Sequence, residues 1–362
     1  MMDLDERTAE LPLGADAMTD VPISTQQFHA VDGAEICGAA VSAAALTWLL
    51  FSAVAWNGAL GAVLVWYATF LLIYRTVARA VHGRLVATDR VMTVVLATGA
   101  SLAFIPLVMI IIFVVSKGLK HLDFGFFTET LESVGPQDKG GGAFHSIIGT
   151  LEQVGIAAAV AIPLAILTAI YLNEVKGRMR GGVRFVIDSM SGLPSIVAGL
   201  FVYSFWVVEL GKGFSGFAGS MALIVLFVPT VTRASEEMLR IVPDSLREAS
   251  LALGASQWKT VFRVVLPNAR SGLISASILG IARAIGETAP MVLTVLGSSA
   301  LNWDPFNANQ DDLPLFILKL IRSPNETQIA RAWTGALVLI ALVLFLFTLA
   351  RLLGRGRRKA TR

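Results

Sequence analysis

Charged residues are scarce in this chain of 362 residues: Asp, Glu, Lys and Arg make up 15% of it, whereas 55% is hydrophobic. A soluble domain carries about a quarter charged residues. The mean hydropathy is +0.70, and the apolar residues gather in blocks of about 20, the length that a helix needs to cross the hydrocarbon core of a bilayer. The shortage of charge therefore argues against an ordinary soluble domain and predicts an all-α polytopic membrane protein.

Cysteine and the motifs of catalysis and metal binding are also missing. Cys37 is the only cysteine, which excludes an intramolecular disulfide and a C-x-x-C metal site. The sequence has no G-x-x-x-x-G-K-[ST] phosphate-binding loop, and its four histidines are scattered along the chain. We therefore expect no enzymatic activity, no resident cofactor and no metal site in this chain.

The N-terminus lacks the basic and then apolar pattern of a signal peptide. Acidic residues instead recur through the first 33 residues. We expect residues 1–33 to form a disordered cytoplasmic tail that is retained.

Eight apolar segments are long enough to span a membrane. They lie at about residues 34–56, 59–76, 91–116, 145–174, 185–210, 217–239, 271–297 and 328–352. The first two segments predict an additional transmembrane hairpin, with a basic linker, over residues 34–90. The other six predict a core over residues 91–352, and a basic cytoplasmic tail follows at 353–362.

Lysine and arginine cluster in alternate connections between these segments. The clusters lie at residues 75–90, 176–184, 247–270 and 351–362. Because cytoplasmic loops carry an excess of Lys and Arg, this pattern predicts that both termini are cytoplasmic and that residues 117–144 and 298–327 lie outside.

Prolines interrupt three successive predicted spans at Pro163, Pro194 and Pro229. Each removes an intrahelical hydrogen bond, and a break at membrane depth persists only where protein or a water-lined cavity satisfies the freed carbonyl. Residues 192–195 form the clearest interruption. The prolines predict either packing kinks or helices that surround a pathway.

The connection at residues 243–270 is polar and strongly patterned. Ser245 and Glu248 have the spacing of a capping box, which predicts a helix over residues 246–253. Gly254 is expected to end this helix in a left-handed cap. A second helix is expected over residues 256–266, with Pro267 ending it.

The first of these helices presents small and apolar side chains on one face: Leu246, Ala249 and Leu253. Such a face suits insertion into the groove of a partner protein. The alternative is an amphipathic connector that lies on the lipid surface.

The spacing of this connection resembles the EAA loop of ABC importer permeases. Glu248-Ala249, Gly254 and Leu266-Pro267 match the pattern, whereas Ser250 replaces a small residue and Val264 replaces an isoleucine. The resemblance implies that a separate cytoplasmic ATPase binds ATP and Mg²⁺ and docks on this loop. The coupling residues that it implies are Leu246, Glu248, Ala249, Gly254 and Pro267.

Two groups of charges fall inside predicted spans. Arg283 and Glu287 are four residues apart, on one face of the predicted seventh span, and serve either as a structural ion pair or as a site for an anion that crosses the bilayer. Arg233, Glu236 and Glu237 end the sixth span, where Arg233 could simply reach the membrane surface.

A narrower resemblance covers about residues 91–350. Residues 142–150, 192–199, 233–237 and 280–290 are similar to PstA-type permeases of the bacterial phosphate transport system. The resemblance implies a type I ABC importer membrane domain with a core of six helices, to which this chain adds its N-terminal hairpin. It also implies that Arg233, Glu236, Arg283 and Glu287 belong to the substrate pathway.

The same resemblance implies a location in the bacterial plasma membrane and a set of partners. These are a PstC-type permease, a PstB-type ATPase dimer, a PstS-type phosphate-binding protein, inorganic phosphate and membrane lipid, with no nucleic acid. We expect the binding protein to deliver phosphate near the aromatic residues Phe124, Phe126 and Phe127. The alternatives are a permease for another oxyanion, such as sulfate or molybdate, a transporter driven by an ion gradient, and a signalling scaffold.

Overall fold

The computed structural model describes residues 30–54, 58–138, 140–175 and 177–354. In this part of the chain the regular elements are helices and helical turns, and one isolated bridge joins Leu296 to Gln310. The expected N-terminal and C-terminal tails lie almost wholly outside the described residues. The chain divides into two compact units, Met1–Leu107 and Val108–Arg362, so residues 91–107 group with the N-terminal hairpin and not with the core.

The first unit contains α1 (Ala30–Val54) and most of α2 (Ala59–Gly118). The 60 residues of α2 would extend about 90 Å as a straight helix, three times the hydrocarbon thickness of about 30 Å. Gly83 has non-helical angles (φ 83°, ψ 173°) and divides α2 into two segments. The basic stretch 75–90, expected as a linker, is helical apart from this break. Arginine favours helices, and one glycine is enough to turn the chain.

A small core holds the first unit together. Phe70 and Tyr74 of α2 pack with Ala39 and Ala43 of α1, and all four side chains are buried. The Glu35 carboxylate at the start of α1 accepts hydrogen bonds from Arg90 (3.1 Å) and His82 (3.2 Å). The unit is therefore held by apolar packing and by one half-buried charge cluster.

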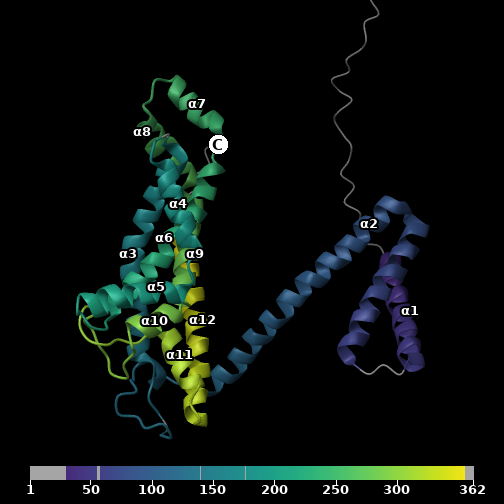
Figure 1. The fold of residues 1–362 in the computed structure, drawn as a ribbon, viewed down its shortest axis with the longest axis horizontal. Coiled ribbons are helices and arrows are strands. Elements are labelled where there is room, and N and C mark those ends of the chain that lie inside the picture. The colour runs from purple at the N-terminus through teal and green to yellow at the C-terminus, as the bar shows by residue number, and fades with distance from the viewer. Residues whose placement is uncertain (1–29, 55–57, 139, 176, 355–362) are drawn as a thin grey trace, which may run out of the picture. The chain divides into compact units, whose positions relative to one another are not determined.

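The second unit is a helical bundle (Figure 1). Its helices are α3 (Phe144–Glu174), α4 (Arg180–Ser191), α5 (Ser195–Val202), α6 (Gly216–Arg240), α7 (Asp244–Ala252), α8 (Gln257–Thr260), α9 (Leu266–Ile285), α10 (Ala289–Thr294), α11 (Leu313–Ile321) and α12 (Glu326–Gly354). Shorter helical turns lie at Leu119–His121, Gly125–Phe127, Tyr203–Glu209 and Val261–Val265.

The centre of this bundle is α6, which packs along α3 and α9 (Figure 1). Ala157, Ala161 and Ala165 on α3 are fully buried in the core. On α9, a Cβ atom at Gly280 would lie 2.4 Å from side-chain atoms of both Phe227 and Val231. Small residues thus let the three helix backbones approach closely, as is usual between helices in a membrane.

The prolines act differently from one another. Both α3 and α6 continue through Pro163 and Pro229, so the expectation of breaks there is wrong, because a helix can lose one hydrogen bond and still be held by its neighbours. At Pro194 the chain does break, and the helical segments Arg180–Ser191 and Ser195–Glu209 meet at 104°. The predicted seventh span also breaks, since α9 ends at Ile285 and α10 begins at Ala289.

Six described helices are long and apolar enough to cross a membrane, and the bent pair on either side of Pro194 makes a seventh. One of the six is the helical stretch Ala59–His121, which contains Gly83. Dividing it at Gly83 accounts for the eight spans predicted from the sequence.

A buried polar network closes the end of the bundle where the chain passes from α10 to α11. The Asp311 carboxylate accepts a hydrogen bond from Ser146 Oγ (2.7 Å) and lies 3.3 Å from Lys319 Nζ. Gln153 Nε2 donates to Gln310 Oε1 (2.9 Å), and Thr150 Oγ1 accepts from the Leu313 amide (2.8 Å). The segment expected as an outer loop with prominent acidic residues therefore folds into the bundle against α3.

Asp312 in this segment is buried and caps α11, with its Oδ1 accepting from the Leu315 amide (2.9 Å). Its Oδ2 has no hydrogen-bond partner among the described residues. Burial, helped by the nearby charge of Asp311, raises the pKa of Asp312 to about 8. The folded state therefore keeps this proton at pH values where the unfolded chain has lost it, and stability falls as the pH rises from about 4 to about 8.

We expect Asp312→Asn to raise the melting temperature of the solubilised protein at pH 9, because the amide carries no charge to bury. The gain should shrink as the pH falls and vanish near pH 4. Thermal unfolding followed by tryptophan fluorescence checks this, with Asp304→Asn, at an exposed position in the same segment, as the control. Equal melting temperatures for Asp312→Asn and wild type at pH 9 would contradict the buried-proton account.

Candidate functional site

Arg283 lies in the last turn of α9, about 25 Å along the helix from its start at Leu266. Its Nε lies 3.5 Å from Oε1 of Glu287. Glu287 follows the end of α9, so the two do not share one unbroken helix as predicted. The pair still forms because the Gly286 and Glu287 amides donate to the Arg283 and Ala284 carbonyls (3.1 and 3.2 Å), which carry the chain through one further turn.

Arg283 and Glu287 border a small cavity between α6 and α9, of about 10 Å³, which is roughly the room for one water molecule. Thr230 and Phe227 of α6 line its other side. Nothing in the sequence distinguished Thr230, since a threonine in an apolar helix most often bonds its own backbone, as it does here to Leu226 (3.0 Å).

The Arg283 side chain is 62% exposed in the isolated chain, whereas Glu287 is 17% exposed. Placing a charge in hydrocarbon costs about 3 kcal/mol even on the most lenient scale. The surface that carries Arg283 must therefore face water or another protein within the membrane.

A second charge cluster joins α4 to α6. The Glu236 carboxylate, 1% exposed, lies 2.7 Å from the guanidinium group of Arg184 and 3.4 Å from that of Arg233. Arg233 also pairs with Asp188 of α4. Arg233 is thus held by two carboxylates and does not simply reach for the membrane surface, which was the alternative from the sequence.

The two charge clusters are separate. Arg233 is not among the residues that border the Arg283 cavity, although Thr230, three residues earlier on α6, is. The sequence analysis did not predict Arg184 and Asp188 as partners of this cluster. The feature that could have indicated them is an opposite-charge pair four residues apart at the start of the fifth predicted span.

The polar connection between α6 and α9 begins differently from the prediction. Helix α7 starts at Asp244, directly after Pro243, and no side chain caps its first turn. The predicted Ser245–Glu248 capping box is therefore wrong, because Pro243 places the helix start two residues earlier. Gly254 has φ 78°, which confirms the predicted left-handed residue after the helix.

The second half of this connection runs directly into α9. Helix α8 (Gln257–Thr260) continues through a π-helical turn at Val261–Val265 into α9, where Pro267 lies in the first turn. The prediction that Pro267 ends a helix is wrong, because the chain stays helical from Gln257 through the π-helical turn to Ile285.

Apolar side chains are exposed along this connection. Leu246, Ala249 and Leu253 are exposed as predicted, and Glu248 is exposed beside them. Trp258 and Phe262 are also exposed and stack on each other, with ring centroids 6.1 Å apart. Exposed apolar surface of this kind is typical of a segment that contacts another protein or the membrane surface.

Arg247 attaches this connection to the bundle. Its guanidinium group lies 2.9 Å from the Glu174 carboxylate at the end of α3 and donates to the carbonyls of Leu239 (2.9 Å) and Val242 (2.6 Å). Gln257 donates to the Glu174 carbonyl, and Ser250 and Thr260 hydroxyls bond at 2.9 Å. No local pattern indicates this anchor, because Glu174 lies 73 residues away.

We expect Arg247→Met to loosen residues 244–256, because it leaves the Glu174 carboxylate without its main partner. Hydrogen exchange of the purified protein should show faster amide exchange in this segment. Arg263→Met, an exposed arginine of the same connection, serves as the control and should leave exchange unchanged. Equal exchange rates in the two variants would contradict the anchoring role.

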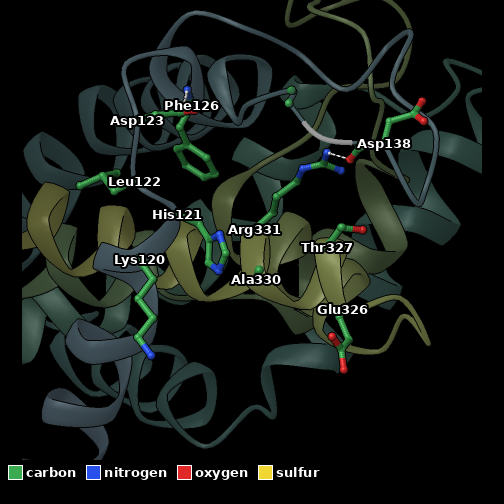
Figure 2. A pocket seen from close by; sticks show the side chains of 12 residues that line it. Lys120, His121, Leu122, Asp123, Phe126, Asp138, Glu326, Thr327, Ala330 and Arg331 are labelled. Atoms are coloured by element: carbon green, nitrogen blue, oxygen red, sulfur yellow. Dashed lines mark hydrogen bonds between the residues drawn. The ribbon is translucent and has the colours of Figure 1, made fainter.

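A larger cavity, of about 540 Å³, lies between residues 120–141 and the start of α12 (Figure 2). Arg331 of α12 donates to the Asp138 carbonyl across it (2.5 Å). Its lining carries both acidic and basic groups, among them Asp123, Glu326 and Lys120, so it favours neither anions nor cations. Near it, Phe124 and Phe127 are exposed, whereas Phe126 is buried and lines the cavity.

Comparison with known proteins places this geometry in context. The model of the family described as binding-protein-dependent transport system inner membrane component matches residues 161–359. Phosphate transport system permease protein PstA 1 of Mycobacterium tuberculosis (strain CDC 1551 / Oshkosh) is 44% identical over 257 residues, which cover 70% of this chain and 84% of that protein. Phosphate transport system permease protein PstA of Mycobacterium leprae (strain TN) is 41% identical over 269 residues, which cover 74% and 88%.

A solved structure also has a similar fold. The bacterial alginate ABC transporter in complex with an alginate pentasaccharide-bound periplasmic protein contains a chain that matches with a TM-score of 0.54 at 15% identity, covering 74% of this chain and 95% of that one. At this identity the similarity concerns the fold alone, which is that of an importer membrane domain.

Proposed function

Because the chain belongs to the family of binding-protein-dependent transport system inner membrane components, we propose that it is the permease subunit of an ATP-driven importer of inorganic phosphate. The observation that carries the proposal is the 44% identity to a phosphate transport system permease over 84% of that protein. The chain is a transport component and not an enzyme, so ATP and Mg²⁺ bind to other subunits.

Arg283 is the group that we assign to the passing anion. A guanidinium group offers several N–H donors in a planar arrangement that matches the oxygens of phosphate. Its large exposed fraction leaves these donors accessible, and the single contact with Glu287 is long at 3.5 Å. Phosphate would exchange part of its hydration shell for hydrogen bonds from Arg283. Glu287 would compete with phosphate for the guanidinium group and so keep the anion from binding too tightly.

The exposed Arg283 supports a pathway shared with a second permease subunit. One chain leaves this charge on its outer surface, and membrane lipid cannot solvate it there. A PstC-type subunit facing α6 and α9 would enclose a water-filled route between the two chains. Thr230 would line the same route beside Arg283.

The connection between α6 and α9 is the proposed contact with a PstB-type ATPase dimer. Leu246, Ala249 and the neighbouring Glu248 are exposed on α7, and the turn at Gly254 orients α7 against α8. Pro267 is the second residue of α9, so a displacement of the connection would act directly on the helix that carries Arg283. This geometry supports mechanical coupling of ATP binding to the pathway.

The orientation follows from the positive-inside pattern. We place the α6–α9 connection and both termini in the cytoplasm of a bacterial cell, with the chain in its plasma membrane. A PstS-type binding protein would then deliver phosphate at the opposite face, near the exposed Phe124 and Phe127.

We expect Arg283→Ala to lower phosphate uptake into cells roughly ten- to hundredfold, the effect of losing charge-assisted hydrogen bonds worth about 1.5–3 kcal/mol. Arg283→Lys should retain part of the activity. The measurement is uptake of labelled phosphate, alone and with a hundredfold excess of sulfate as competitor. At this excess, a site that binds oxyanions in general would be filled by sulfate. Arg322→Ala, at an exposed position of the same bundle, is the control.

Wild-type uptake by an assembled Arg283→Ala complex would refute the role of this arginine. Full inhibition of wild-type uptake by sulfate would show a different oxyanion specificity, and uptake that persists without ATP would point to a transporter driven by an ion gradient.

We expect Gly254→Val to uncouple the ATPase from transport. No atom lies within 4 Å of a Cβ added at Gly254, so the substitution acts only through the positive φ of 78°, which costs a non-glycine residue about 1–2 kcal/mol and costs a β-branched one most. Phosphate uptake should fall at least about tenfold, since 1.4 kcal/mol corresponds to a factor of ten. ATP hydrolysis in the purified complex should no longer respond to the loaded binding protein.

Gly254→Asn is the matched variant, because asparagine tolerates this conformation. It should keep most of the uptake. If both variants transport and hydrolyse ATP like wild type, the turn does not take part in coupling.

A further inference from the structure

Helices α4 and α6 are joined by a reciprocal set of ion pairs. Arg184 and Asp188 lie four residues apart on α4 and therefore face the same side. Arg184 pairs with Glu236 of α6 (2.7 Å), and Asp188 pairs with Arg233 of the same helix. Each helix thus contributes one basic and one acidic residue, and each residue pairs with the opposite charge on the other helix.

The centre of this set is the Glu236 carboxylate, which is 1% exposed. Besides Arg184 it contacts Arg233 (3.4 Å) and, at the limit of an ion pair, Arg240 (3.9 Å). A carboxylate so deeply buried cannot touch a passing anion in this conformation. Its position instead fixes the guanidinium groups around it.

Arg184 is the closest of these partners and the only one on another helix. Removing Arg184 would leave the buried carboxylate with only its two more distant guanidinium groups, which is destabilising for that arrangement. Without Arg184, the carboxylate would draw Arg233 or Arg240 away from its present place.

The fold gives α4 little else to set its angle. The break at residues 192–194 turns the chain by 104°, so α5 does not continue the direction of α4. On its apolar side, Ile187 and Val183 pack against the core formed by α3 and α6. The two ion pairs add a directional constraint to this apolar packing.

We infer that Arg184 and Asp188 are positioning residues, which hold Glu236 and Arg233 of the phosphate pathway in their working geometry. This inference rests on the proposed function and on the resemblance to PstA-type permeases, which implies that Arg233 and Glu236 belong to the substrate pathway. The pair Arg184–Glu236 should contribute more than Asp188–Arg233, because the latter side chains are 46% and 41% exposed and exposed pairs contribute little.

A double-mutant cycle tests this inference. Arg184→Met, Glu236→Gln and the double variant are expressed in the full transporter, and the maximal rate of labelled phosphate uptake is divided by the amount of assembled complex. Arg184→Met should lower this rate at least about tenfold, in line with the cost of truncating a buried charge pair. Arg184→Lys should restore most of it, and Asp188→Asn should lower it only about threefold, as for an exposed pair.

The decisive result is the double variant. If Arg184 acts through Glu236, adding Arg184→Met to Glu236→Gln should cause no further loss. Arg180→Met, at an exposed position on the same helix, is the matched control and should transport like wild type.

Three results would overturn the inference: wild-type uptake by Arg184→Met, losses in the two single variants that multiply in the double variant, or no rescue by Arg184→Lys. If the wild-type complex itself takes up no phosphate, the proposed function fails and the positioning roles fail with it. If wild type transports and Arg184→Met matches it, only the positioning roles are wrong.

Discussion

The cost of placing charge in hydrocarbon governs the arrangement of this molecule. With so few charged residues, each one within the bundle must be paired or must face water. Glu236 is surrounded by arginines, Asp311 by Lys319 and Ser146, and Glu174 by Arg247. Arg283 is different, because most of its side chain is exposed and its one acidic contact is long, and this difference is what makes it a candidate for contact with a transported anion.

Breaks in the helices lie close to several of these charged residues. The chain turns at Gly83, at residues 192–194 and at residues 286–288, and the last two breaks lie beside the charge clusters of α4 and α9. A helix that ends within the bundle can be held by a few ion pairs and can also be moved by them. The continuous path from the exposed connection through Pro267 into α9 suits an element that transmits motion along its length.

Features that repeat along the sequence were predictable. Apolar length located the spans, and the positive φ of Gly254 followed from its place after a helical pattern. The Arg283–Glu287 contact was expected from spacing alone, although the helix ends between the two residues. These are local properties, which depend on neighbours within about one or two turns.

Features that depend on distant partners were not predictable. Arg184 and Glu236 are 52 residues apart, and Arg247 and Glu174 are 73 apart, so no local pattern relates them. Most of the prolines do not end helices. Pro163 and Pro229 leave their helices unbroken, and Pro267 lies within the continuous helical stretch Gln257–Ile285, because packing decides whether a lost hydrogen bond ends a helix. The basic stretch 75–90 had the composition of a linker and is mostly helical, since charge does not prevent helix formation.

The central claim is that the face of α6 and α9 around Arg283 lines a water-filled route. Because Cys37 is the only cysteine, Cys37→Ser provides a background for single cysteines introduced by Thr230→Cys and, on the exposed surface of α12, by Leu344→Cys. In the assembled transporter, a membrane-impermeant thiol reagent should label the cysteine at position 230, phosphate should slow the labelling, and the cysteine at position 344 should stay unlabelled. No labelling at position 230 in any nucleotide state, or equal labelling at both positions regardless of phosphate, would contradict the account.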